Sequence, residues 1–165
     1  MEREGSSSDR RAPVVRTVGF WLAGGIAGAG LFWLVQVVSG GPTITDFMGA
    51  QIVSGGGYPE RLAPLIGWAV HLGVSVSYAF LFGALVLALD RLASPTRAAL
   101  TFVAALALGA ITAITAPPAI SVTISLLSGQ GWPRELFPLN TELGLPFLNH
   151  ITFFVLNWVI QALEG

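Results

Sequence analysis

Charged residues divide this chain into long uncharged runs over residues 17–45, 62–89, 98–133 and 143–163. Each run contains the roughly 20 residues that a helix needs to cross about 30 Å of hydrocarbon at about 1.5 Å per residue. The pattern predicts an all-α membrane protein with a single bundle of four transmembrane helices. We expect the spans at about 17–39, 63–89, 97–118 or somewhat beyond, and 144–163.

Two connections between these spans carry amphipathic patterns of their own. In PTITDFMGAQIV, Thr43 stands three residues before Asp46, which is typical of a helix start. The apolar residues that follow fall on one side of a short helix. The third connection, SGQGWPRELFPLNTELGLP, repeats the theme with Trp132 and Phe137. We therefore expect short amphipathic helices in both outer loops, lying in the membrane interface.

The end of the third span has an unusual pattern. After Pro117 and Pro118 the sequence AISVTISLL alternates apolar and polar residues, as a strand does. A lone strand in hydrocarbon would leave its backbone groups unpaired, at a cost of several kcal/mol each. We expect a kinked continuation of the helix, with Ser121, Thr123 and Ser125 bonding back to the backbone or facing neighbours. A segment that leaves the bilayer near Pro117 is the alternative.

Composition and charge agree with a location in lipid. The 165 residues are 53% hydrophobic and 10% charged, whereas a soluble domain carries roughly 25% charged residues. Four Arg residues precede the first span and two lie in the second connection, against one each in the first and third connections. Because positive charge stays on the cytoplasmic side, we expect both termini in the cytoplasm. The Ser-rich tail, residues 1–16, is expected to be disordered.

The same composition excludes several kinds of chemistry. Cysteine is absent, which excludes disulfides, thiolate metal sites and iron–sulfur clusters. The net charge of −1 offers no electrostatic footprint for nucleic acid. Every basic residue is Arg, a bias typical of GC-rich bacterial genomes, so the expected location is the bacterial cytoplasmic (inner) membrane.

Small residues mark the expected helix contacts, because helices in lipid associate through close backbone approach and interhelical hydrogen bonds. Gly24 and Gly28 form a GxxxG spacing in the first span, with Gly25 and Ala29 one step round. In the third span, small residues share one side at positions 105, 109 (Gly109) and 112. These faces serve packing within the chain or against a partner.

The chain contains two histidines, and both lie in apolar spans. At helical spacing, His71 shares a face with Gly67, Ser75, Tyr78 and Phe82. His150 shares a face with Asn157 and Gln161. Since lipid cannot hydrogen-bond polar side chains, these residues are expected to point into the bundle. Counting from the span ends, the two imidazoles can share one level in the outer leaflet.

Several interpretations of the histidines stay open. Each imidazole can be a hydrogen-bonded interior group that fixes helix rotation. Alternatively, His71 and His150 can ligate a b-type haem, with Arg61 and Arg134 alone available for the propionates. A polar transport pathway and a single-metal site are further alternatives. The spans contain no carboxylate placed to orient an imidazole and no nucleophile motif, so we expect no enzyme.

The segments GWAVHLGVSVSYAFLFG and NHITFFVLNW, with the Gly-rich first span and the amphipathic outer loop, resemble the YagU-like four-helix inner-membrane proteins of bacteria. The resemblance implies an inner-membrane protein with one histidine in the second span and one in the fourth, and no agreed activity. Val74, Phe153 and Phe154 stand where smaller residues are typical of that pattern.

The function expected from the sequence is that of a non-catalytic accessory or structural subunit of a larger respiratory or photosynthetic membrane complex. Its expected partners are the lipid bilayer and other membrane subunits, with no nucleic acid and no cofactor. A haem-binding electron carrier and a small transporter are the alternatives.

Overall fold

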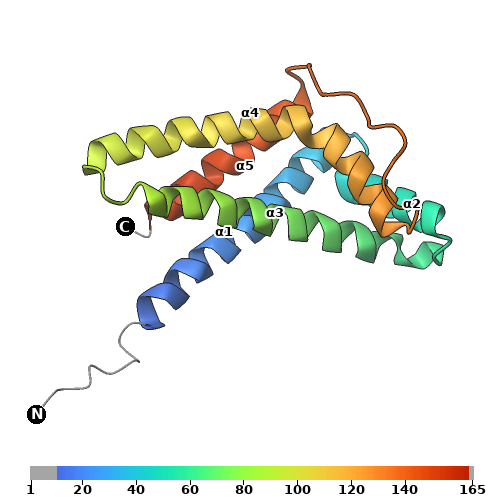
Figure 1. Cartoon of the computed structure of the whole chain (residues 1–165), viewed down its shortest axis with the longest axis horizontal. Helices are drawn as coiled ribbons and strands as arrows, with labels where there is room; N and C mark the ends of the chain where they lie inside the picture. The colour runs from blue at the N-terminus through green and yellow to red at the C-terminus, as the bar shows by residue number, and fades with distance from the viewer. Residues whose placement is uncertain (1–10, 164–165) are drawn as a thin grey trace, which may run out of the picture.

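The computed structural model describes residues 11–163, and within this range it contains five α-helices and no strand (Figure 1). The helices are α1 (Arg11–Val38), α2 (Ile44–Gly56), α3 (Ala63–Ala88), α4 (Ser94–Leu127) and α5 (Leu145–Ala162), with a short 3₁₀-helix, η1 (Glu60–Leu62), before α3. Helix α1 begins earlier than expected, within the segment predicted to be a disordered tail. There the Arg16 guanidinium lies 5.7 Å from the centre of the Phe20 ring. Residues 1–10 of that tail lie outside the described residues.

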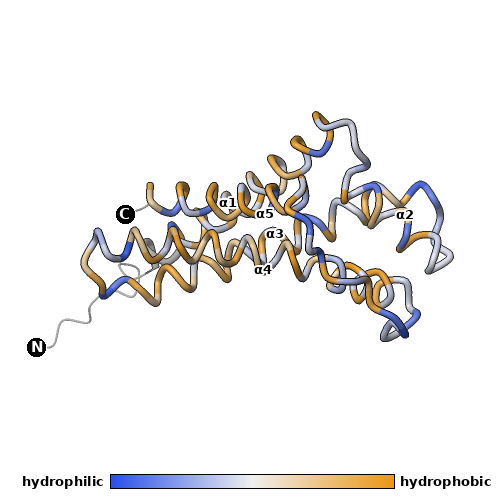
Figure 2. The backbone as a smooth tube through the Cα atoms, turned by 90° about the horizontal axis from the view of Figure 1, so that it is seen from above, coloured by the Kyte–Doolittle hydropathy of each residue, from blue (hydrophilic) through white to orange (hydrophobic). Residues whose placement is uncertain are grey.

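Four helices are long and apolar enough to cross a membrane, which confirms the predicted number and order of the spans. They cover Val15–Val38, Glu60–Ala88, Ser94–Leu127 and Leu145–Ala162. Apolar residues predominate along all four (Figure 2). Large apolar side chains such as Leu65, Val103 and Ile111 are more than half exposed. Such a surface requires an apolar solvent, so the chain is a multi-pass membrane protein.

The four long helices do not pack equally against one another. Helix α1 packs against α3 and α5, and α5 packs against α4, whereas α3 and α4 share few contacts. Helix α2 packs along the first half of α3 and touches α4. The ends of the helices therefore form two clusters (Figure 1): α2, the start of α3 and the end of α4 lie together, opposite the end of α3 and the start of α4.

An aromatic core joins α3, α4 and α5. Phe82, Ala105, Phe153 and Phe154 are buried together. The indole Nε1 of Trp158 on α5 donates to Thr101 Oγ1 on α4, at 3.1 Å. This core holds α5 between α3 and α4 over the half of the bundle that is remote from α2.

Helix α2 confirms the amphipathic helix expected in the first outer loop. The Thr43 hydroxyl accepts from Asp46 N at 3.1 Å and caps the helix, and Gln36 Oε1 accepts from Ile44 N at 2.9 Å. Helix α2 packs tightly along α3. A Cβ on Gly49 of α2 would overlap the carbonyl of Ala63, and a Cβ on Gly67 of α3 would overlap the carbonyl of Thr45. One face of the helix is thus buried in the bundle, with Met48, Ile52 and Val53 inside, whereas Phe47 and Gln51 on the other face are exposed.

The prediction of a second amphipathic helix, in the third connection, is wrong. Residues 128–144 form no helix. Gly129 and Gly131 adopt positive φ of 75° and 77°, and Pro133 and Pro138 provide no backbone N–H for a helical ladder. This irregular segment, which we call the outer loop, runs along the bent end of α4 (Figure 1).

Helix α4 continues through the proline pair to Leu127, which confirms the kinked continuation, and it bends midway along its length (Figure 1). Pro118 has no N–H to donate to the carbonyl of Ile114 one turn earlier. Asn140 of the outer loop donates its backbone N–H to that carbonyl instead, at 3.0 Å. The proline therefore both bends the helix and frees an acceptor that holds the outer loop.

The close α2–α3 contact is testable by substitution at Gly67. Gly67→Ala is expected to destabilise the protein by about 1–3 kcal/mol, because the new methyl group meets the Thr45 carbonyl. Gly73→Ala is the matched control in the same helix, since a Cβ there has no neighbour within 4 Å. It should be neutral or stabilising by up to about 1 kcal/mol. Thermal unfolding in detergent measures both variants, and equal stability would contradict the close contact.

Candidate functional site

A cavity of about 570 Å³ lies at the end of the bundle nearer α2. We call it the histidine cavity, because both His71 and His150 line it. Its walls come from α3, α4 and α5, with contributions from the end of α1, the start of α2 and the outer loop. Most of the lining is apolar. Besides the histidines, the lining includes Phe32, Val74, Ser75, Tyr78, Ala116, Ala119, Thr123, Glu142 and Phe153.

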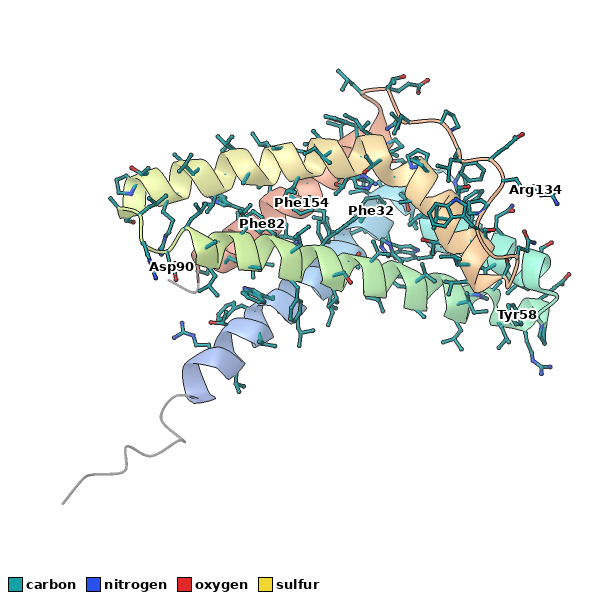
Figure 3. All side chains as sticks on the ribbon, in the orientation of Figure 1. Phe32, Tyr58, Phe82, Asp90, Arg134 and Phe154 are labelled. Atoms are coloured by element: carbon teal, nitrogen blue, oxygen red, sulfur yellow. The ribbon has the colours of Figure 1, made fainter. Side chains whose placement is uncertain are left out.

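The structure brings the two histidines to one level, around a single aromatic ring. The Phe32 ring centre lies 5.5 Å from that of His71 and 5.1 Å from that of His150. Phe32 lies at the centre of the bundle in Figure 3. The inward orientation that sequence spacing predicted for each histidine therefore places both in the same cavity.

Each imidazole is hydrogen-bonded to a backbone carbonyl. His71 Nε2 lies 3.1 Å from the carbonyl oxygen of Ala29 on α1. His150 Nδ1 lies 2.8 Å from the carbonyl oxygen of Pro146, one turn earlier in α5. A carbonyl only accepts, so these two nitrogens carry the protons. In the neutral imidazoles the remaining nitrogens, Nδ1 of His71 and Nε2 of His150, are then acceptors.

Two hydroxyl groups join the imidazoles in the cavity wall. Ser75 and Tyr78 follow His71 along α3, and neither hydroxyl has a hydrogen-bond partner among residues 11–163. The Thr123 hydroxyl also lines the cavity but donates to the carbonyl of Ala119 at 2.8 Å. Of the described residues around the cavity, Glu142 alone has a charged side chain. The site is therefore neutral at depth, with polar groups on a largely apolar wall.

Two serines of α4 hold the first part of the outer loop against this helix, outside the cavity. Ser121 donates to the carbonyl of Glu135 at 3.2 Å, and Ser125 donates to that of Gly131 at 2.8 Å. The sequence predicted that these hydroxyls face the backbone or neighbours, without identifying the outer loop as their acceptor. The loop residues at the cavity, from Pro138 to Glu142, were missed entirely. Pro118, which frees the carbonyl to which Asn140 bonds, was the available signal.

The small residues of α1 and α4 lie at contacts within the chain. A Cβ on Gly28 would lie 2.5 Å from the Phe153 ring, and one on Gly24 would overlap the amide of Asn157. A Cβ on Gly109 would lie 2.9 Å from the Cα of Ile151. These three glycines therefore allow α1 and α4 to approach α5 closely, on both of its sides.

Asn157 and Gln161 are buried, but they lie outside the cavity. Asn157 Nδ2 donates to the carbonyl of Phe153 at 2.9 Å, and its Oδ1 faces Gly24 of α1. Neither this Oδ1 nor the amide of Gln161 has a hydrogen-bond partner in the described part of the chain. The polar residues predicted to share one face of α5 therefore face different neighbours: His150 faces the cavity and Asn157 faces α1.

The arrangement does not fit a haem held by both histidines. Such a haem needs one free nitrogen from each ring, directed at a common iron. Each ring keeps one nitrogen without a protein partner, but the Phe32 ring packs against both imidazoles, so a macrocycle between them would have to displace it. A metal ion fits no better, since no cluster of three or more His, Cys, Asp or Glu side chains occurs among the residues described.

Comparisons with known proteins provide no relative for this site: no family model, no curated protein and no solved structure matches the chain.

The role of Pro118 in holding the outer loop is testable by hydrogen exchange. In Pro118→Ala the residue regains an N–H for the carbonyl of Ile114, so the Asn140 amide loses its acceptor. Amide exchange at Asn140 is expected to accelerate by about tenfold. Pro95→Ala, at the first turn of α4, should leave this exchange unchanged. Full protection of Asn140 in Pro118→Ala would show that the loop is held by other contacts.

Proposed function

We propose that this chain is a non-catalytic membrane protein that binds a lipophilic small molecule in the histidine cavity. The observation that carries the proposal is the cavity itself, about 570 Å³, mostly apolar and lined by both intramembrane histidines. This volume lies within the range of about 300–1,000 Å³ that is typical of small-molecule sites, which also combine apolar walls with few polar groups.

The position of the cavity supports entry of the ligand from the bilayer. Val74 on α3 and Ala119 on α4 both line the cavity and are exposed on the outer surface of the bundle. Helices α3 and α4 share few contacts, which supports an opening toward lipid between them. A molecule dissolved in the membrane reaches the histidines by this route without crossing water.

The polar groups of the cavity support binding in preference to catalysis. Both imidazoles bond to backbone carbonyls, and neither has a carboxylate partner that would orient it as a general base. The excess of Arg beside the first span and in the second connection supports a bacterial inner membrane with both termini in the cytoplasm.

Filling the cavity provides the test. Ala116→Phe places a ring in the cavity and is expected to weaken binding of a fluorescent apolar probe, such as N-phenylnaphthylamine, by at least about tenfold. Ala107→Phe is the matched control, since this alanine is exposed on α4 and does not line the cavity. Titrations in lipid nanodiscs, with empty nanodiscs as baseline, measure the affinity. Equal binding by both variants would refute a ligand site here.

The role of accessory subunit is a second candidate, favoured by the outer face of α1. Gly24 and Gly28 face α5, but another set of small residues, Gly19, Ala23 and Ala27, is exposed. A Cβ on Gly19 would have no neighbour within 4 Å. A helix that faces only lipid has no need of small residues, whereas a partner helix packs best against them. This face supports association with another membrane-spanning subunit, the role expected from the sequence.

Association through α1 is testable by the size of the native assembly. The protein isolated gently from its own membrane is expected to be larger than one chain, with partner chains in fixed ratio. Ala23→Leu with Ala27→Leu should reduce the retained partner by at least about tenfold, because both methyl groups face outward. Ala107→Leu on α4 should retain it. Isolation of the wild-type chain always alone would refute the subunit role.

A further inference from the structure

The hydrogen bonds of the two histidines determine what kind of ligand the cavity accepts. His71 donates to Ala29 and His150 donates to Pro146, and both acceptors are backbone carbonyls. The only nitrogens left to a ligand, in neutral imidazoles, are lone-pair acceptors. A ligand that offers only acceptors, such as a ketone, an ester or an ether, gains no hydrogen bond from either ring.

The charges around the cavity narrow the class of ligand further. The described residues around the cavity provide no Arg or Lys, and their one charged side chain is the carboxylate of Glu142, an exposed residue. An anion would find no counter-charge in the cavity, and a cation would lose its hydration shell in a neutral interior. Both kinds of binding are therefore unfavourable. The ligand that matches this environment is neutral.

The walls indicate the shape of the ligand. The Phe32 ring contacts both imidazoles, although all three residues are far apart in the sequence. Phe153 and Tyr78 also line the cavity. Aromatic rings favour edge-to-face and offset contacts with another ring. The free hydroxyls of Ser75 and Tyr78 can each donate or accept, and Gln36, Asn140 and Thr141 add further polar side chains to the lining.

We propose that the histidine cavity is selective for neutral lipophilic phenols, whose hydroxyl donates to a histidine nitrogen and whose ring packs against Phe32. This inference rests on the proposed function and names the ligand class of the same site. His150 is the principal acceptor, because its bond to Pro146 holds the ring in its own helix while Nε2 is left to the cavity. No bond is made or broken in the ligand, so the selectivity is one of binding alone.

The experiment compares a phenol with its methyl ether. 4-Nonylphenol and 4-nonylanisole have nearly the same shape, but only the phenol donates a hydrogen bond. In lipid nanodiscs, with empty nanodiscs as baseline, the phenol is expected to bind about tenfold more tightly. Tryptophan fluorescence reports binding, since the Trp68 ring centre lies 6.0 Å from that of His71. Long-chain 1-dodecanol should bind more weakly than the phenol, and equal affinity would overturn the requirement for an aromatic ring.

Two variants at His150 test the acceptor. His150→Phe keeps a ring of similar size without an acceptor, so the preference for the phenol should fall to about twofold or less while the ether still binds. His150→Gln restores an acceptor oxygen and should recover most of the preference. Binding of the ether by His150→Phe also shows that this variant is folded.

The outcomes separate this inference from the proposed function. If neither compound binds the wild-type protein, while N-phenylnaphthylamine does, the phenol class is wrong and the cavity remains a lipophilic site. If all three fail to bind, the proposed function fails as well. Equal affinity for phenol and ether in the wild-type protein overturns the assignment of the histidines as acceptors. An unchanged preference in His150→Phe overturns the assignment of His150 as the principal acceptor.

Discussion

Within a membrane, the backbone N–H and C=O groups of a protein must be paired within the protein. In this chain, the hydrogen bond from Asn140 N–H to the carbonyl of Ile114 follows from that constraint. Hydrocarbon offers no partner for a freed carbonyl. Pro118 creates one within α4, and the outer loop provides the donor at 3.0 Å. The bend in α4 and the loop that covers the histidine cavity are therefore two parts of a single arrangement.

The need to pair polar groups also explains why each histidine keeps one nitrogen as an acceptor. Ala29 lies in a stretch of α1, residues 23–30, made mostly of Gly and Ala, so its carbonyl is within reach of His71 on the neighbouring helix. Pro146 lies in the first turn of α5, where its carbonyl accepts from His150. Each bond satisfies one nitrogen and orients the ring, and the other nitrogen remains for the cavity. A structural role and a recognition role are thus combined in each side chain.

The glycines act through a different force, which is the close approach of backbones in lipid. Helix α5 is contacted by Gly28 of α1 on one side and by Gly109 of α4 on the other. Helix α2 meets α3 through Gly49 and Gly67. These contacts leave α3 and α4 with little direct packing, and the space between them is the histidine cavity. Tight packing at these three contacts therefore accompanies the loose packing between α3 and α4.

The sequence by itself determined the four spans, the capped helix after Thr43, the continuation of α4 past Pro117 and the inward direction of the polar side chains. These features follow from local periodicity and from the cost of exposing polar groups to lipid, which each segment carries in its own residues. Only the tertiary structure decided which nitrogen of His71 carries the proton, that Asn157 faces Gly24 and not the cavity, and that residues 128–144 form a loop bound to Ser121 and Ser125. Each of these depends on a partner distant in sequence, and spacing along one helix contains no information about the atom that lies opposite on another.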